Sequence, residues 1–238
     1  MNKKIGVVGG MGPMASQLFY KMVTEMTEAE KDQDHLNMVI LSDSSMPDRT
    51  KAILSGDEEE VRRKLREDLQ ILARCGCEAA CITCNTAHYF ADQVEGEVDI
   101  PIIHMIKETA GKIAKENPGG KIAILATDGT IRTGLYQKRL EEAGVQPYIP
   151  AAETQKQVMY QIYDRIKKGL DWDAASWDTI EDEVRRAGCS RAIMACTELS
   201  VIKADNGLSD FYVDPMEVLA ERAIEFAGKT VKKNRKQE

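Results

Sequence analysis

Short unbroken apolar runs recur along the chain and are separated by longer segments with helical periodicity. The runs predict buried strands at residues 5–8, 38–41, 79–83, 122–125, 192–195 and 211–213. Between them, apolar side chains recur every three or four positions, which predicts helices at residues 14–30, 58–75, 106–115, 135–143, 158–168 and 177–187. Strands that alternate with helices are typical of parallel sheets covered on both faces. The pattern therefore predicts an α/β fold.

One segment divides this pattern into two similar parts. Residues 95–101 are rich in polar residues, glycine and proline, and they separate two α/β runs. We expect two similar Rossmann-like half-domains with parallel sheets and an active site in the cleft between them. The first comprises residues 1–100 together with 210–238, because the last strand and helix could return to it. The second comprises residues 101–209.

Each predicted half carries one cysteine at the end of a buried strand. Cys84 and Cys196 both follow an apolar run and both precede Asn or Thr. Ligands of parallel α/β folds bind at the carboxyl ends of strands, and a helix that begins there lowers the pKa of a nearby thiol. Buried cysteines are often only small hydrophobic residues. Two in matching contexts instead favour a pair of thiols that face one cleft. Such a pair could take a proton from one face of a carbon and return one to the other.

The motifs around these cysteines carry a family resemblance. Cys84-Asn85-Thr86-Ala87-His88 and Ala195-Cys196-Thr197-Glu198-Leu199 resemble the paired signatures of the aspartate/glutamate racemase superfamily, and of its aspartate racemase branch in particular. Residues 9–13, 45–50, 126–131 and 166–169 also match, so the resemblance covers about residues 4–225. Glutamate racemases usually carry His where this chain has Glu198, and they have an Asp-Ser pair that residues 9–12 lack. These departures favour aspartate over glutamate.

The resemblance implies cofactor-independent racemisation by two bases. One cysteine, as thiolate, takes the α-proton, and the other, as thiol, delivers a proton to the opposite face. In this chain Cys84 and Cys196 fill these positions. The α-carboxylate would be held by preorganised donors. The candidates are Asn85, Thr86, Thr130 and Thr197, with Met11 in the opening loop and with His88 and Glu198 in supporting roles.

An acidic substrate also needs a partner for its distal carboxylate. Arg49 offers a two-pronged guanidinium, which we expect on a loop after a strand. Lys167 resembles the second basic contact of the family. Lys168 is its neighbour, and the spacing alone does not separate the two.

Four other interpretations compete with acidic amino-acid racemisation. Four thiols between residues 75 and 84 could bind zinc, but the two pairs are too close together for a usual zinc site, and we expect no metal. Residues 10–15 match a Gly-rich dinucleotide loop, although Pro13 removes one N–H and no ribose-binding acid is evident. Hydantoin racemases and maleate isomerases of the same superfamily also use two cysteines. A protein that binds an amino acid without turnover needs neither thiol.

Composition and charge indicate which binding partners and which cellular location to expect, but they do not indicate the reaction. The net charge of −7 argues against a nucleic-acid surface. No apolar stretch is long enough to span a membrane, and the run after Lys3 and Lys4 is too short for a signal peptide. Six cysteines without an export signal predict reduced thiols in the cytoplasm. The expected partner is a small acidic amino acid, and the resemblance suggests a homodimer.

Overall fold

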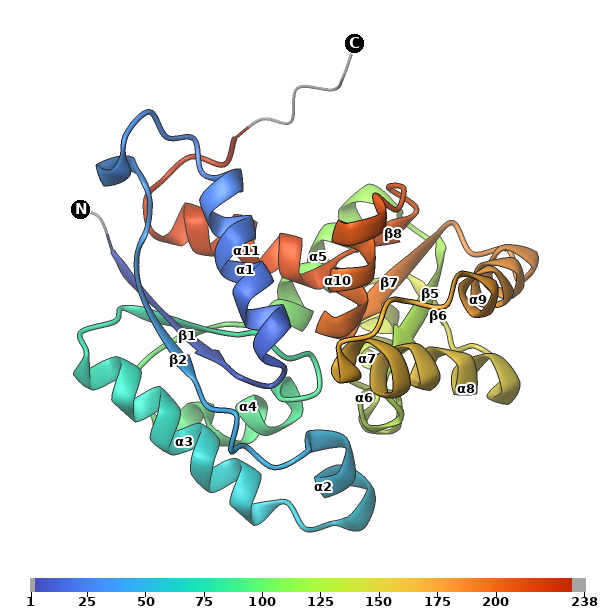
Figure 1. The fold of residues 1–238 in the computed structure, drawn as a ribbon, viewed down its shortest axis with the longest axis horizontal. Helices are drawn as coiled ribbons and strands as arrows, with labels where there is room; N and C mark the ends of the chain where they lie inside the picture. Colours follow the sequence, from blue (N-terminus) through green and yellow to red (C-terminus); the bar gives the residue numbers. More distant parts are fainter. Residues whose placement is uncertain (1–2, 233–238) are drawn as a thin grey trace.

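Two four-stranded parallel sheets organise the computed structural model, which describes residues 3–232 (Figure 1). The first sheet has the order β2-β1-β3-β4 and the second has the matching order β6-β5-β7-β8. The first comprises β1 (Lys4–Gly9), β2 (Asn37–Ser42), β3 (Ala79–Ile82) and β4 (Ile102–Ile103). The second comprises β5 (Lys121–Ala126), β6 (Gln146–Tyr148), β7 (Arg191–Ala195) and β8 (Tyr212–Val213). The predicted α/β fold with two similar halves is confirmed.

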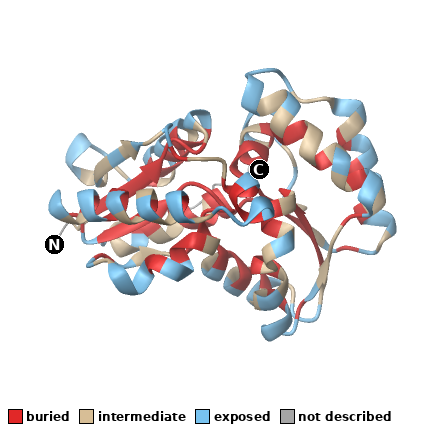
Figure 2. Ribbon diagram, turned by 90° about the horizontal axis from the view of Figure 1, so that it is seen from below, coloured by how far each residue is buried: buried red, intermediate tan, exposed pale blue. Residues whose placement is uncertain are grey.

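Helices cover both faces of each sheet. They are α1 (Pro13–Met26), α2 (Arg49–Ser55), α3 (Glu59–Arg74), α4 (His88–Val94), α5 (Met105–Glu116), α6 (Asp128–Thr133), α7 (Leu135–Glu142), α8 (Ala152–Tyr160), α9 (Ala174–Arg186), α10 (Thr197–Asn206) and α11 (Pro215–Phe226). Their inner sides are buried and their outer sides exposed (Figure 2). In α3, for example, Val61, Leu65, Leu69 and Leu72 are buried at helical spacing. None of the helices within residues 3–232 has the length and apolarity needed to cross a membrane.

The apolar runs located the central strands, whereas two short edge strands were missed. β4 has only two residues, and β6 consists of Gln146, Pro147 and Tyr148, which make no apolar run. The prediction of one regular α-helix at residues 158–168 is wrong. There, α8 ends at Tyr160 and continues as a π-helical turn (Gln161–Arg165) and a 3₁₀ turn (Ile166–Lys168).

The chain crosses between the halves at positions that differ from the predicted boundaries. β4 pairs with β3 in the first sheet, although residues 102–103 were assigned to the second half. β8 pairs with β7 in the second sheet, although residues 212–213 were assigned to the first. The return to the first half begins at α11, where Met216, Leu219 and Ala223 pack with residues of β1 and α1, and it continues to Val231, which forms an antiparallel bridge with Thr27. The division into two domains stays a prediction, and its outermost residues, 1–2 and 233–238, lie outside the described residues.

Candidate active site

The two predicted cysteines lie at the carboxyl ends of central strands in different sheets. Cys196 follows β7 directly and caps the amino end of α10. Cys84 lies two residues after β3, and a turn separates it from α4, so only Cys196 sits at a helix terminus. Both thiols line one narrow space, where they are 6% and 7% exposed. The space is also lined by Met11, Asp48, Arg49, Thr50, Thr86, Thr127, Tyr163, Lys167 and Glu198.

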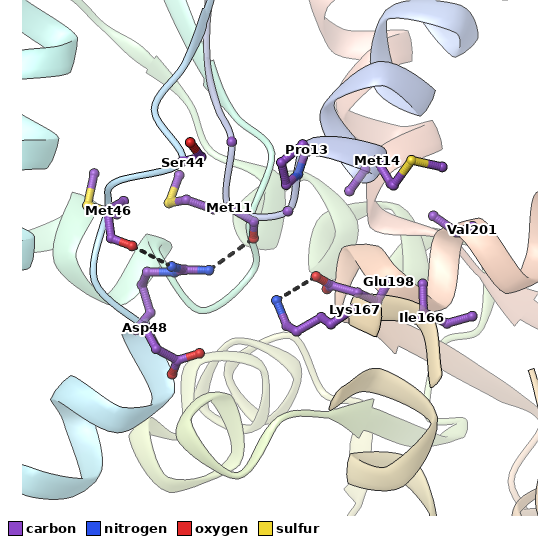
Figure 3. A pocket seen from close by; sticks show the side chains of 14 residues that line it. Met11, Pro13, Met14, Ser44, Met46, Asp48, Ile166, Lys167, Glu198 and Val201 are labelled. Carbon is purple, nitrogen blue, oxygen red and sulfur yellow. Dashed lines mark hydrogen bonds and ion pairs between the residues drawn. The ribbon is translucent and has the colours of Figure 1, made fainter. Parts of the chain in front are cut away.

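This inner space is almost filled by protein side chains. Its volume is about 10 Å³, which is roughly the room that one water molecule requires. Outside it lies a larger cavity of about 320 Å³, bordered by residues 10–15, Ser44, Met46, Asp48, Arg49, Ile166, Lys167, Glu198 and Val201 (Figure 3). Five residues border both spaces, namely Met11, Asp48, Arg49, Lys167 and Glu198. A substrate in the outer cavity would therefore meet these side chains first.

Cys196 lies beside a carboxylate that disfavours its ionisation. Its Sγ donates a hydrogen bond to Oε2 of Glu198 over 2.9 Å. The other carboxylate oxygen accepts from Nζ of Lys167 at 2.6 Å (Figure 3). Burial, and then the charge of Glu198, raise the pKa of Cys196 well above its usual value, although Lys167 acts in the opposite direction. Cys196 is therefore a protonated thiol in this arrangement.

Arg49 lies on the other side of the space and interacts with Cys84. Burial by itself would lower the pKa of Arg49, but attraction to Cys84, and then to Asp48, raises it. Nη1 donates to the carbonyls of Met46 and Pro47, at 3.3 and 2.9 Å, and Nη2 donates to the carbonyl of Met11 at 3.0 Å. Nε is buried without a hydrogen-bond partner. The expected position on a loop is wrong, since Arg49 is the first residue of α2.

Three threonine hydroxyls form a closed ring across the two halves. Oγ1 of Thr86 lies 3.1 Å from Oγ1 of Thr127 and 2.8 Å from that of Thr130, and the last two are 3.2 Å apart. All three side chains are buried. Each hydroxyl has one proton and can also accept, so a carboxylate could replace bonds within the ring. Thr86 and Thr127 line the inner space, and Thr130 lies behind them.

Two further predicted carboxylate ligands are buried outside the lining of the inner space. Asn85 accepts a hydrogen bond from the hydroxyl of Tyr136 at 2.6 Å, while its Nδ2 has no partner. The hydroxyl of Thr197 lies 3.5 Å from Oε2 of Glu198. Both side chains therefore support the walls of the site in this state.

His88 is a neutral support for the loop that carries Cys84. Its Nδ1 lies 2.9 Å from the carbonyl of Cys84, and its Nε2 accepts from the backbone N–H of Met105 at 3.2 Å. Burial, and then the neighbouring His104, lower the pKa of His88 to about 3. An imidazole with Nδ1 as donor and Nε2 as acceptor satisfies both contacts. His88 therefore fixes backbone geometry and does not exchange protons with the substrate.

The structure separates the two neighbouring lysines. Lys167 borders the inner space, whereas Lys168 is exposed and pairs with Asp164. Sequence reasoning missed Asp48, Thr50 and Thr127 as named contacts, although all three lie in segments that matched the family. Tyr163 was missed altogether, because its segment was read as a regular helix.

The glycines of the loop between β1 and α1 permit close packing. Gly10 has a φ of +86°, and a Cβ there would lie 2.5 Å from the backbone of Asp43. A Cβ on Gly12 would lie 3.0 Å from Oε1 of Glu198. The loop thus brings Met11 to the site, a role that needs no dinucleotide.

The remaining cysteines do not join the site. Cys81 is fully buried, among residues on the opposite face of the first sheet from Cys84. Cys75 is exposed, and Cys77 and Cys189 are buried in two separate hydrophobic clusters. Within residues 3–232, no three His, Cys, Asp or Glu side chains converge as a metal site would require.

Comparison with known proteins assigns this arrangement to a family. A family model described as Asp/Glu/Hydantoin racemase matches residues 8–223. The broad specificity amino-acid racemase of Bacillus subtilis (strain 168) is 26% identical over 204 residues, which cover 83% of this chain and 86% of that protein.

Solved structures agree over nearly the whole chain. An aspartate racemase from Picrophilus torridus is 30% identical with a TM-score of 0.81, and the match covers 97% of this chain and 96% of that one. An aspartate racemase homologue from Pyrococcus horikoshii OT3 is 27% identical with a TM-score of 0.76, over 96% and 100% of the two chains. The chain therefore belongs to the Asp/Glu/hydantoin racemase family and is an isomerase of the amino-acid racemase type.

Proposed function

We propose that the protein racemises an acidic amino acid without a cofactor, with aspartate as the first substrate and glutamate as the second. The observation that carries this proposal is that Cys84 and Cys196, from different sheets, line one narrow space. Arg49 and Lys167 border the same space and supply the positive charge that a dicarboxylate requires.

The reaction is a pair of proton transfers at the α-carbon. A thiolate takes the α-proton, so that an S–H bond forms as the Cα–H bond breaks and the electron pair stays on the substrate. The opposite thiol then gives its proton to the other face of the carbon and becomes a thiolate. After one turnover the two sulfur atoms have exchanged protonation states, and exchange with solvent restores the first.

The surroundings of the two thiols favour one starting state. The guanidinium of Arg49 interacts with Cys84, whereas Cys196 donates a hydrogen bond to Glu198. We therefore assign Cys84 the role of the first base, because a guanidinium faces it, and Cys196 the role of the acid. The carboxylate of Glu198, which already accepts a hydrogen bond from Cys196, can take and return this proton as the roles reverse.

The substrate's two carboxylates have separate partners in this proposal. The hydroxyl ring of Thr86, Thr127 and Thr130 receives the α-carboxylate, whose bound charge stabilises the developing carbanion. Nε–H of Arg49 and the ammonium of Lys167 receive the distal carboxylate. Lys167 must then release Glu198, so the free enzyme uses its own carboxylate where the substrate's would bind.

A wider substrate range is the second candidate. The outer cavity of about 320 Å³ is bordered by Met11, Met14 and Met46, whose flexible thioethers adapt to apolar side chains of different shapes. The relative named a broad specificity amino-acid racemase supports this alternative. Other two-cysteine chemistry of the superfamily, such as dicarboxylate isomerisation, and binding without turnover stay as alternatives to racemisation.

Proton exchange at the α-carbon tests the proposal directly. L-aspartate is incubated in D₂O with the purified protein and no added cofactor, and the α-proton signal is followed by NMR. The signal should disappear, and formation of D-aspartate should be lost with Cys84→Ser or Cys196→Ser, because return of a proton to the opposite face needs both thiols. Cys75→Ser is the matched control, because Cys75 is exposed and outside the site. Retention of the signal with both enantiomers of aspartate and glutamate would reject acidic amino-acid racemisation. A panel of apolar amino acids then tests the wider range.

Location and assembly stay predictions from the sequence. Free thiolate chemistry requires a reducing compartment, which supports the cytoplasm. The homodimer is tested by light scattering of the purified protein.

A further inference from the structure

Three side chains separate the inner space from the molecular surface. Asp48, Thr50 and Tyr163 line the inner space, and they also line a shallow groove on the outer side of α2 together with Lys51, Leu54 and Ser55. Asp48 and Thr50 belong to the first half, and Tyr163 comes from the π-helical turn of the second. This wall is therefore formed where the two halves meet.

A hydrogen bond to a carboxylate joins the halves at this wall. The hydroxyl of Tyr163 donates to Asp48, with distances of 3.0 and 3.3 Å to the two carboxylate oxygens. Burial, and then the charge of Asp48, raise the pKa of Tyr163, so the phenol stays protonated and remains a donor. Asp48 also caps α2, because its Oδ1 accepts from the N–H of Lys51 at 2.8 Å. The bond thus holds the amino end of α2, where Arg49 begins the helix.

A glycine allows the same helix to approach the second half closely. Gly129 lies in α6, and a Cβ there would come within 2.9 Å of Cα and 3.0 Å of Oγ1 of Thr50. Backbone cannot retreat from such a contact without moving α2 as a whole. Gly129 is not among the glycines with positive φ, so alanine would suit its backbone conformation. Its absent side chain is therefore required by packing across the cleft and not by the helix itself.

We propose that Tyr163 and Gly129 are positioning residues that seat α2, and with it Arg49, against the second half of the molecule. The closed inner space holds about one water molecule, so a substrate enters only when its walls separate, and the contact of α2 with the second half forms one of these walls. The proposal rests on the proposed two-thiol function in one respect, namely that Arg49 and the thiols serve the reaction. The seating of α2 itself is a property of the free protein.

Alkylation of the buried thiols measures this opening without any turnover. The free protein is treated with iodoacetamide, and the modification of Cys84 and Cys196 is followed by peptide mass spectrometry. Exposed Cys75 in the same molecule gives the reference rate. When closing is faster than alkylation, the rate follows the population of the open form.

Two variants weaken the closed form in different ways. Tyr163→Phe keeps the ring and removes the bond to Asp48, and Gly129→Ala inserts a methyl group against Thr50. Tyr163→Phe should raise alkylation of Cys84 and Cys196 relative to Cys75 by roughly tenfold, the effect of losing one hydrogen bond to a charged group. Gly129→Ala should raise it by more than twofold, because the added methyl group would lie 2.9 Å from Cα of Thr50 in the closed form. Asp48→Asn keeps an N-cap and should act in the same direction. The double variant D48N/Y163F should react no faster than Y163F, because without the Tyr163 hydroxyl there is no bond left for the Asp48 substitution to weaken.

Matched controls separate seating from general loosening. Tyr148→Phe removes another tyrosine hydroxyl that donates to a carboxylate, that of Glu183 at 3.0 Å, away from the cleft. Gly111→Ala adds a methyl group in α5, where no atom lies within 4 Å. Both should leave the relative rates unchanged. Rates for Tyr163→Phe and Gly129→Ala within twofold of the unsubstituted protein, or equal increases in the controls, would overturn the proposal.

Added aspartate distinguishes this proposal from the proposed function. In Tyr163→Phe, saturating aspartate should return the alkylation rate toward that of the unsubstituted protein, because a ligand that bridges the halves favours the closed form. Faster alkylation without protection by any acidic amino acid would support the seating of α2 and contradict the proposed substrate.

Discussion

Glu198 controls the ionisation of Cys196, and this control can be measured by removing a single charge. Glu198→Gln keeps the size and a hydrogen-bond acceptor but removes the carboxylate charge 2.9 Å from the sulfur. The pKa of Cys196, which burial and Glu198 now raise, should fall in this variant. Lys167 acts in the same direction, because its ammonium loses the carboxylate that it pairs with at 2.6 Å.

The geometry sets the size of the effect. Two unit charges 2.9 Å apart interact by about 6 kcal/mol at an effective dielectric constant of about 20. This is an upper limit, because the carboxylate charge is shared by two oxygens and a thiolate can turn away. Neighbouring charges in proteins usually shift a pKa by about 1 to 3 units. We therefore expect the pKa of Cys196 to fall in Glu198→Gln, because the charge that most opposes its ionisation is gone.

The assay is the pH dependence of alkylation of Cys196 by iodoacetamide, read by peptide mass spectrometry. Because only the thiolate reacts, a lower pKa moves the rise of the profile to lower pH. Glu153→Gln is the control, since Glu153 is exposed and pairs only with Lys156. A profile for Glu198→Gln that coincides with that of the unsubstituted protein would refute the electrostatic coupling.

Three other substitutions test separate parts of the site and its support. His88→Leu removes the hydrogen-bond partner of the Cys84 carbonyl and of the Met105 N–H. The free energy of unfolding, measured by urea denaturation, should therefore fall by about 2 to 4 kcal/mol. A change below about 0.5 kcal/mol would contradict the supporting role of His88. Burial, and then Asp43, raise the pKa of Asp68 to about 6, so stability should fall as pH rises from about 4 to about 6. Asp68→Asn should therefore raise the free energy of unfolding by about 1 to 2 kcal/mol at pH 7.5 and by much less at pH 4.5, and an equal effect at both pH values would exclude this titration. In Arg49→Lys the ammonium cannot donate to the same three carbonyls as the planar guanidinium does, so kcat/KM for aspartate should fall by about tenfold or more. An unchanged kcat/KM would show that the reaction does not need the guanidinium.

Much of the fold could be predicted because its signals are local. The apolar runs at residues 5–8, 79–83, 122–125 and 192–195 mark strands buried on both faces, and such strands need continuous apolar sequence. β6 carries no such signal. β6 lies at the edge of its sheet and pairs with one strand only. A short segment of Gln146, Pro147 and Tyr148 is therefore tolerated there, although it contains a proline.

In the candidate site, too, some features follow from neighbouring residues and others depend on contacts between distant segments. Cys84 and Cys196 follow short buried apolar strands, so their position at strand ends was evident from neighbouring residues. Arg49 was expected to bind the distal carboxylate with its guanidinium, but Nη1 and Nη2 donate to three backbone carbonyls. Those carbonyls come from Met11, Met46 and Pro47, and one of them is distant in sequence.

The sequence alone determined the α/β class, the two similar halves and the pair of thiols, because each depends on residues close together in the chain. Only the tertiary structure decided that Cys196 faces a carboxylate while Cys84 faces a guanidinium, and that Tyr163 meets Asp48, 115 residues away. The physical reason is that charge and hydrogen bonding act through space. The ionisation of a thiol depends on every group within a few ångströms of it, whatever part of the chain supplies that group.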